Sequence, residues 1–360
     1  MCAHLVPFHT TILHKISLRF KVRGFQVPLS REFSEVIIRH SGSNEGFVLF
    51  TSTGPVRDLF YVTGLAPFPV YLLGGSKPVL FEAGVACAAK LYGQEIHSAL
   101  GAKEPEILFL THAHWDHCGA ASYLKSIFPS LTIAASRMSA DILKRQHARE
   151  FIDRLNKSAK PAIAALPRVD PSQLVDGIFT PFEVDMELKD GELIKLEEGL
   201  SLEVLATPGH TRDLMSYYIP QKKILITSEA SGCLDSIGNI IPQFLADYDA
   251  YLFSLKRLTD LPVEILCQGH RTVFVGRQEV RAFFTRSVTA TIRFKERVYE
   301  LLETEAGSID RVVGRIKAEQ YDINEGIKQP ELPYLLILKT QVTHLAEKRS
   351  HSQGVPMIPQ

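Results

Sequence analysis

Residues 109–120 read FLTHAHWDHCGA and place four metal-ligand side chains within six positions, directly after a short apolar run. The four are His112, His114, Asp116 and His117. On an extended segment residues two apart point to the same side, so His112, His114 and Asp116 share one side, and a turn brings His117 beside Asp116. Imidazole nitrogens and carboxylates are ligands that Zn²⁺, Fe²⁺ and Mn²⁺ accept. The segment therefore predicts a metal site at the end of a buried strand.

Three more ligand-type side chains follow apolar, strand-like runs elsewhere in the chain. LEVLATPGH ends at His210, KKILITSE at Glu229 and VEILCQGH at His270. Either histidine alone would indicate little, but beside the first cluster they predict ligands delivered by several strands to one end of a sheet. His112 with His114, and Asp116 with His117, form two pairs of ligand-type residues on one short segment. Such closely spaced pairs are too strained to close around a single ion, so we expect two neighbouring divalent ions, zinc, iron or manganese.

The charge balance excludes several classes of partner. Lys plus Arg equals Asp plus Glu, at 40 each in 360 residues, so there is no excess charge to attract nucleic acid or an anionic membrane. No apolar run approaches the roughly 20 residues of a membrane-spanning helix. The five cysteines lack CxxC spacing, which favours a reducing compartment, the cytoplasm, over a disulfide framework. We therefore expect no nucleic-acid or membrane partner.

The sequence pattern divides the chain into four segments. Residues 1–32 form a basic leader, either an organellar presequence or, as we prefer, a flexible segment. Runs of short strands with helices between and after them predict an α+β domain over 33–276, with a sheet-on-sheet core flanked by helices. One helical stretch in it, 139–166, is expected to break at Pro161. Residues 277–350 read as a helical lid, and 351–360 as a disordered tail.

The aromatic and apolar side chains of the C-terminal helices have two interpretations. They are Phe283, Phe284, Phe294, Tyr299, Tyr334 and Leu335. They would either form an apolar lid over the metals or pack the helices onto the domain, and packing is the commoner role for any single one.

The motifs THAHWDHCG, TPGHT, ITSEAS and QGH together resemble the metallo-β-lactamase superfamily over about residues 35–271. The resemblance implies a four-layer αβ/βα sandwich, here followed by a C-terminal helical extension. It also implies that His112, His114 and His210 bind one metal, that Asp116, His117 and His270 bind the second, and that Glu229 is the bridging carboxylate. Most relatives carry aspartate at that last position. Glutamate reaches about one methylene further, so it would bridge with altered metal spacing or bind through one oxygen.

Within the superfamily, the stretches PVYLLGG, FIDRLNKSA and DAYLFSLKRLTDLPVEILCQGH are similar to the quinolone-signal response thioesterases, which act on an aminobenzoylacetyl-CoA. This second resemblance implies an acyl-CoA thioesterase with a helical C-terminal section. It also leaves open a regulatory protein partner.

Two adjacent cations lower the pKa of a shared water and make hydroxide available at neutral pH. Asp116 is the expected catalytic residue, because it faces that water and can take up its proton. We therefore expect a hydrolase that uses a metal-bound hydroxide on a small-molecule thioester or ester, with acyl-CoA favoured. The alternatives are a phosphodiester or sulfate-ester hydrolase, and a regulatory binding protein that keeps a metal site. A homodimer is compatible with either class.

Overall fold

The computed structural model describes residues 37–40, 46–49, 54–166, 169–235, 238–325 and 328–353. They all belong to the larger of the two units into which the chain divides, Ser34–Gln360. The predicted leader, residues 1–32, and residues 354–360 of the predicted tail lie outside the described residues. Within the described ranges, no helix is both long enough and apolar enough to cross a membrane.

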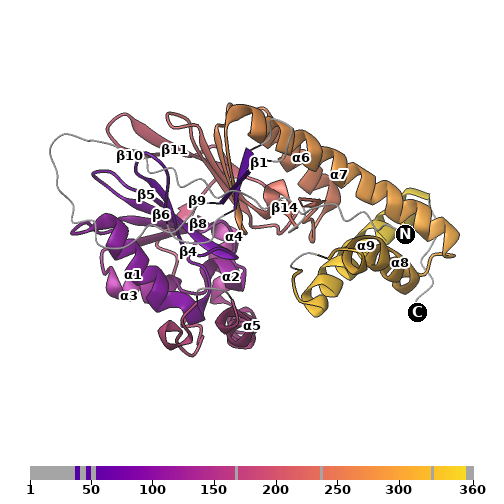
Figure 1. The fold of residues 1–360 in the computed structure, drawn as a ribbon, viewed down its shortest axis with the longest axis horizontal. Coiled ribbons are helices and arrows are strands. Elements are labelled where there is room, and N and C mark those ends of the chain that lie inside the picture. The colour runs from indigo at the N-terminus through magenta and orange to yellow at the C-terminus, as the bar shows by residue number, and fades with distance from the viewer. Residues whose placement is uncertain are drawn as a thin grey trace, which may run out of the picture. The chain divides into compact units, whose positions relative to one another are not determined.

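Two β-sheets lie face to face (Figure 1). The first has the order β3-β4-β5-β6-β7-β8-β9, with β3 (Gly54–Arg57), β4 (Phe60–Leu65), β5 (Phe68–Leu73), β6 (Val79–Phe81), β7 (Ile107–Phe109), β8 (Thr132–Ser136) and β9 (Met186–Leu188). The second has the order β1-β2-β17-β16-β13-β12-β11-β10, with β1 (Ile37–His40), β2 (Gly46–Leu49), β10 (Leu193–Glu197), β11 (Leu200–Ala206), β12 (Met215–Ile219), β13 (Ile224–Ser228), β16 (Ile265–Gln268) and β17 (Thr272–Val275). A separate ribbon pairs β14 (Cys233–Leu234) with β15 (Ile240–Ile241).

The central strands are continuous apolar runs because both of their faces are buried. In β16, Ile265 and Cys267 point into the core between the sheets, and Leu266 points into the core on the outer face. The same alternation holds in β7, where Leu108 and Phe109 belong to different cores. Side chains that alternate between two apolar layers leave no position for a polar residue, which explains why these strands show no polar alternation.

Helices cover the outer faces of both sheets. On the first sheet lie η1 (Ala86–Ala88), α1 (Ala89–Leu100), α2 (Trp115–Cys118), α3 (Ala121–Ile127), α4 (Arg137–Lys144), α5 (Gln146–Ala164) and η2 (Pro171–Gln173); with the second sheet are η3 (Glu229–Ser231), α6 (Tyr248–Thr259), α7 (Arg277–Thr304), α8 (Ile309–Ile316), the π-helix η4 (Lys317–Asp322) and α9 (Glu331–Gln353). Each helical layer shares a buried apolar cluster with the sheet that it covers.

The order of layers is thus helices, sheet, sheet, helices. The expected four-layer sandwich with a C-terminal helical extension is therefore confirmed.

The break in the helical stretch 139–166 differs from the expectation. The chain leaves the helix at Arg145, whose backbone is extended, and Pro161 lies inside α5. Pro161 falls in the last turn, where the helix ends at Ala164, so only one intrahelical hydrogen bond near the end is lost.

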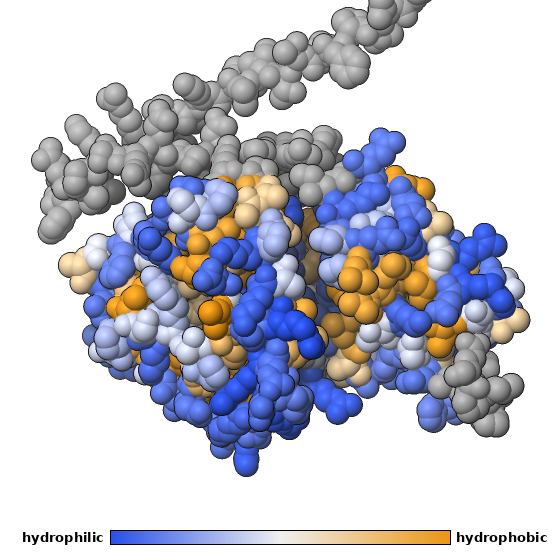
Figure 2. All heavy atoms as spheres, turned by 90° about the horizontal axis from the view of Figure 1, so that it is seen from below, coloured by the Kyte–Doolittle hydropathy of each residue, from blue (hydrophilic) through white to orange (hydrophobic). Residues whose placement is uncertain are grey.

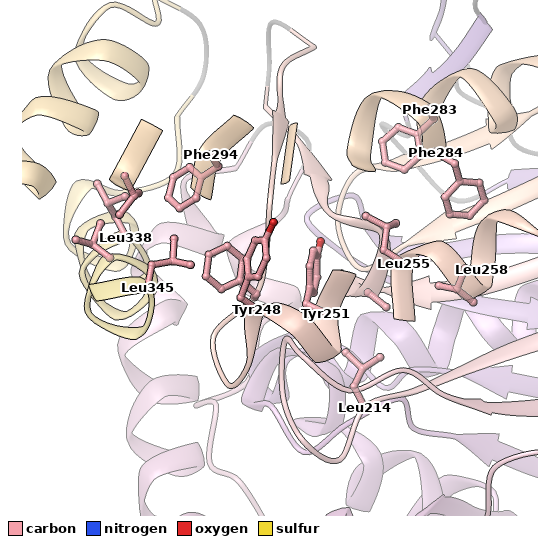
Figure 3. Packing of buried hydrophobic residues seen from close by; sticks show 14 of the residues in the cluster. Leu214, Tyr248, Tyr251, Leu255, Leu258, Phe283, Phe284, Phe294, Leu338 and Leu345 are labelled. Carbon is pink, nitrogen blue, oxygen red and sulfur yellow. The ribbon is translucent and has the colours of Figure 1, made fainter. Parts of the chain in front are cut away.

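The helical extension packs as part of the core. Phe283, Phe284, Phe294 and Tyr334 are buried in the cluster that covers the outer face of the second sheet, and Tyr299 and Leu335 pack against it. Figure 3 shows Phe283 and Phe284 of α7 beside α6, and Phe294 beside Leu338 and Leu345 of α9. These side chains therefore fill a core, and a lid role of segment 277–350 over the metals stays a prediction. The last helix, α9, extends to Gln353, three residues into the expected tail.

Some apolar surface remains exposed on the extension. Leu332 and Leu336 of α9 lie one helical turn apart and are both largely exposed, while Leu338, Val342 and Leu345 of the same helix are buried. Figure 2 shows apolar side chains gathered on the right half of the lower face, the half that carries α8 and α9 in Figure 1. The helix therefore has one face in the core and apolar residues on another.

We predict that Phe283→Ala destabilises the protein by about 3–5 kcal/mol, because it empties a buried site against a packed ring. Phe283 is 1% exposed and its ring centroid lies 4.3 Å from that of Phe274. Phe253→Ala on α6 is the matched control, since that ring is 72% exposed, and it should change stability by no more than about 0.5 kcal/mol. Urea unfolding followed by circular dichroism measures both. Equal effects would contradict the integration of α7 into the core.

Candidate metal centre

Four strand ends carry the predicted ligands to one place. His112, His114, Asp116 and His117 lie on the segment after β7 and on α2, whose N-cap is His114. His210 follows β11, Glu229 directly follows β13, and His270 follows β16. Because β13 and β16 are parallel neighbours, their carboxyl ends meet at the same edge of the sheet.

The first group consists of His112, His114 and His210. One nitrogen of each lies within 4.8 Å of one nitrogen of the others, and His210 Nε2 is 3.3 Å from His114 Nδ1. The Nε2 atom of His112 is sealed from solvent and has no hydrogen-bond partner. A buried polar atom without a partner is costly, and a metal ion bound by the three imidazoles would satisfy it. These residues therefore fit a metal ion.

The second group consists of Asp116, His117 and His270, again within 4.8 Å of one another. Glu229 lies between the two groups. Its Oε1 is 3.0 Å from His117 Nε2 and 2.8 Å from His270 Nε2, while its Oε2 is 3.8 Å from His112 Nε2. The structure thus brings all seven predicted residues together, and their role as ligands stays a prediction. Cys118 and Cys267, which also lie near the site in sequence, are core residues.

Four of the imidazoles are oriented through Nδ1. The partners of His112, His117, His210 and His270 are, in that order, Thr111 Oγ1 at 2.9 Å, Glu82 Oε1 at 3.1 Å, the Gln243 carbonyl at 2.5 Å and the Pro67 carbonyl at 2.6 Å. Carbonyl and carboxylate oxygens only accept, so Nδ1 carries the hydrogen. Thr111 accepts too, because its own hydroxyl hydrogen goes to Glu82. Nε2 of each ring is thereby left for a metal, as is usual for histidine ligands.

Glu82 is a site residue that the sequence analysis missed. It is buried directly after β6, accepts from the Thr111 hydroxyl at 2.5 Å, and accepts from His117 Nδ1 at 3.1 Å. It therefore orients His117 directly and His112 through Thr111. Glu82 also lies within ligand distance of both histidines, but these hydrogen bonds engage its carboxylate away from Nε2. The available signal was VLFEAG, an apolar strand that leads into an acidic residue, as KKILITSE does at Glu229.

Asp213 is a second missed residue. Its buried Oδ2 accepts from the Ala113 backbone N–H at 2.9 Å and from the Ser139 hydroxyl at 2.7 Å. It thereby ties the residue between His112 and His114 to the start of α4. Nothing in the sequence connects Asp213 with positions 100 residues away, so only the fold reveals this contact.

The two groups differ in their protonation. Burial, followed by the charges of the neighbouring histidines, lowers the pKa of His112 well below its ordinary value, and burial lowers the pKa of His210 to about 4. Burial alone would also lower the pKa of His117 and His270, but the Glu229 carboxylate outweighs it and raises both. Burial would raise the pKa of Glu229, but His117 and His270 hold it well below its ordinary value. In the metal-free protein, Glu229 thus favours the protonated forms of His117 and His270, and the two histidines favour its ionised form.

The residues of this site lie within a segment that matches a known family. The sequence profile of the metallo-beta-lactamase superfamily matches residues 66–270, more than half of the chain. The chain belongs to the metallo-beta-lactamase superfamily. Members are hydrolases with metal sites, and the match contains all seven predicted ligands and also Glu82.

Curated relatives differ in their substrates. The chain is similar to the atrochrysone carboxyl ACP thioesterase of Aspergillus fumigatus, with 23% identity over 58% of this chain and 52% of that one. It is also similar to the hydroxyacylglutathione hydrolase GloC of Haemophilus influenzae, with 30% identity over 49% of this chain and 74% of that one. The match covers 53% of the hydroxyacylglutathione hydrolase of Bartonella tribocorum. The chain thus spans about half the length of two of these three relatives.

Solved structures confirm the fold. The sec-alkylsulfatase of a Pseudomonas species aligns with a TM-score of 0.58 at 16% identity, covering 87% of this chain and 53% of that one. A metallo-beta-lactamase variant of Cronobacter sakazakii aligns with a TM-score of 0.51 at 18% identity, covering 72% of this chain and all of the other. At these identities the likeness concerns the fold alone.

We predict that the two groups release different numbers of protons when they bind metal. His117 and His270 hold protons that a metal must displace, whereas His112 and His210 are already neutral at pH 7. The second equivalent of Zn²⁺ should therefore release about one or two protons more than the first, and its affinity should rise more steeply with pH. Titration calorimetry in buffers of different ionisation enthalpy measures this release. Equal release by both equivalents would contradict the assignment.

We predict that Glu82→Gln weakens metal binding by roughly 10- to 100-fold, because the amide is a poorer acceptor for His117 and for the Thr111 hydroxyl that orients His112. Competition with a chromogenic zinc chelator measures the affinity. Glu187→Gln serves as the control, since that exposed carboxylate lies on β9. Unchanged zinc affinity in Glu82→Gln would show that the carboxylate is dispensable for the site.

Proposed function

We propose that the chain is a metal-dependent hydrolase of thioesters, with acyl-CoA as the favoured substrate class and two divalent ions, zinc, iron or manganese, in its site. The observation that carries the proposal is the convergence of two groups of ligand-type side chains on the carboxylate of Glu229. The unpartnered, buried Nε2 of His112 supports it, because a cation would remove the cost of that atom.

Each group would hold one ion. His112, His114 and His210 suit the first, and Asp116, His117 and His270 suit the second, with Glu229 between them. When bound, such ions lower the pKa of water and supply a nucleophile at neutral pH. No side-chain nucleophile is needed for the reaction.

Asp116 is the proposed catalytic residue. Its Oδ2 lies 3.8 Å from Nε2 of both His117 and His270. Its side chain is 12% exposed, whereas that of Glu229 is 3% exposed, so water and substrate reach Asp116 more readily. The carboxylate is placed to orient the attacking water and to take up its proton.

An aromatic pair beside the second group suits the acyl part of a thioester. The ring centroid of Phe68 lies 5.6 Å from Trp115 and 5.9 Å from His270, both in edge-on contact. Phe68 and Trp115 are both only partly buried, so they present apolar surface next to the predicted ligand His270.

The chemistry of a thioester also suits the site, because a thiolate is a good leaving group that departs without a strong acid.

Two relatives support the substrate class. One is named a thioesterase and another a hydroxyacylglutathione hydrolase. The similarity to a sulfatase concerns the fold alone, so sulfate esters and phosphodiesters enter as competing outcomes of the assay. A homodimer and a regulatory protein partner stay predictions.

The test is release of thiol from a panel of acyl-CoA esters by metal-loaded protein, followed with a chromogenic thiol reagent. Asp116→Asn should lower kcat by roughly 10²- to 10⁴-fold, because the water loses its proton acceptor. His147→Ala on α5 is the control, since that histidine is exposed and outside the site, and it should retain full activity.

Trp115 gives an independent readout, because it is the only tryptophan of the chain. Product carboxylates that bind beside the second group should change its fluorescence in wild type. Metal-loaded protein that ignores every thioester but cleaves a phosphodiester or a sulfate ester would show that the thioesterase assignment is wrong.

A further inference from the structure

The residue before Glu229 has an unfavourable backbone. Ser228 adopts φ +49° and ψ −130°. The left-handed region open to residues with a side chain lies near ψ +30 to +60°, so this conformation suits only glycine, which lacks the Cβ that clashes. Serine at this position therefore carries strain, and strain of this kind is concentrated at functional sites.

Neighbouring elements hold the turn through hydrogen bonds to the residues that follow Glu229. The Ser231 carbonyl accepts from the Ser287 hydroxyl of α7 at 2.6 Å, and the Ser231 hydroxyl lies 2.8 Å from that of Thr227. The Gly232 carbonyl accepts from the Gln268 side chain at 2.5 Å. A strained residue persists when its surroundings fix it in this way. The turn that carries Glu229 is thus held from α7, β13 and β16.

The Ser228 hydroxyl uses this shape to reach the next side chain. It donates to Glu229 Oε2 at 2.6 Å, and its oxygen lies 3.4 Å from His117 Nδ1, whose hydrogen goes to the nearer Glu82 carboxylate at 3.1 Å. The other oxygen, Oε1, is the one that faces His117 and His270 at 3.0 and 2.8 Å. The two oxygens are therefore engaged differently, and a glycine at 228 would relieve the backbone but remove the hydroxyl.

We propose that Ser228 is a positioning residue that fixes the carboxylate of Glu229, so that Oε1 serves the Asp116–His117–His270 group while Oε2 is held by the hydroxyl. The inference rests on the proposed metal-dependent function. Glu229 would then contribute to the second group through Oε1, while the Ser228 hydroxyl engages Oε2. On this account, serine rather than glycine occupies position 228, despite the backbone strain, because only serine supplies the hydroxyl that holds Glu229 Oε2.

The experiment compares Ser228→Ala with Ser228→Gly. Both lose the hydroxyl, so both should bind the second equivalent of Zn²⁺ roughly 10- to 100-fold more weakly than wild type while the first equivalent is unchanged. Only glycine relieves the backbone, so metal-free Ser228→Gly should melt about 2–4 °C above metal-free Ser228→Ala. Calorimetric titration and thermal unfolding measure the two effects without any substrate.

Ala306→Gly is the matched control for strain. Ala306 has φ +50° in the turn between α7 and α8. Glycine at this position should therefore raise the melting temperature of the protein as well. The zinc affinity of this variant should stay at the wild-type value. A double-mutant cycle tests the route of action. In a Glu229→Gln background, Ser228→Ala should cause no further loss of zinc affinity, because the hydroxyl acts through that carboxylate.

Three outcomes would overturn the inference. They are wild-type affinity for the second equivalent in Ser228→Ala, equal melting temperatures of the two Ser228 variants, and a full additional loss in the Glu229→Gln background. Wild-type protein that binds no metal would overturn it together with the metal-dependent function. Wild-type protein that binds two equivalents but cleaves no thioester refutes only the thioesterase proposal, and the result at Ser228 then still decides the inference.

Discussion

The convergence of buried imidazoles is the constraint on which the structure depends. Nitrogens of His112, His114 and His210 approach one another closely, and no solvent screens His112. Four of the five imidazoles of the site are anchored from behind through Nδ1, which keeps their side chains from rotating toward water. The anchors are the Thr111 hydroxyl after β7, the Glu82 carboxylate after β6, and two backbone carbonyls, one just before β5 and one before α6. The ends of both sheets must therefore meet at this place for the site to exist.

The sequence was sufficient to predict the layered fold and the seven residues that the structure brings together, for one physical reason. Each predicted ligand follows an apolar strand, and strand ends gather where the sheets end. The sequence did not reveal Glu82 as an anchor or Asp213 as a tie to Ala113, because those contacts join strands distant along the chain. Apolar periodicity showed that α7 has a buried face, but it could not tell whether Phe283 faced the metals or the second sheet. It faces the sheet.

Glu82 also links the two groups chemically. Its carboxylate accepts from His117 directly and from Thr111, whose hydroxyl in turn accepts from His112. The three contacts form one chain of hydrogen bonds from one group to the other, and polarisation at one end alters the strength of the next bond. The two groups are thus coupled through the protein on the side away from Glu229, as well as through Glu229 itself.

The contact between Ser287 and the Ser231 carbonyl limits how such a protein diversifies. Extensions after the sandwich are natural places to exchange whole modules, since a new one brings new surface without disturbing the sheets. Here the first helix of the extension supplies both apolar packing and a hydroxyl donor to the turn next to Glu229. A replacement extension would need a hydroxyl donor at the position of Ser287 in its first helix, so that the Ser231 carbonyl keeps its hydrogen bond. Exchange of α7 would therefore also change the support of the candidate metal centre.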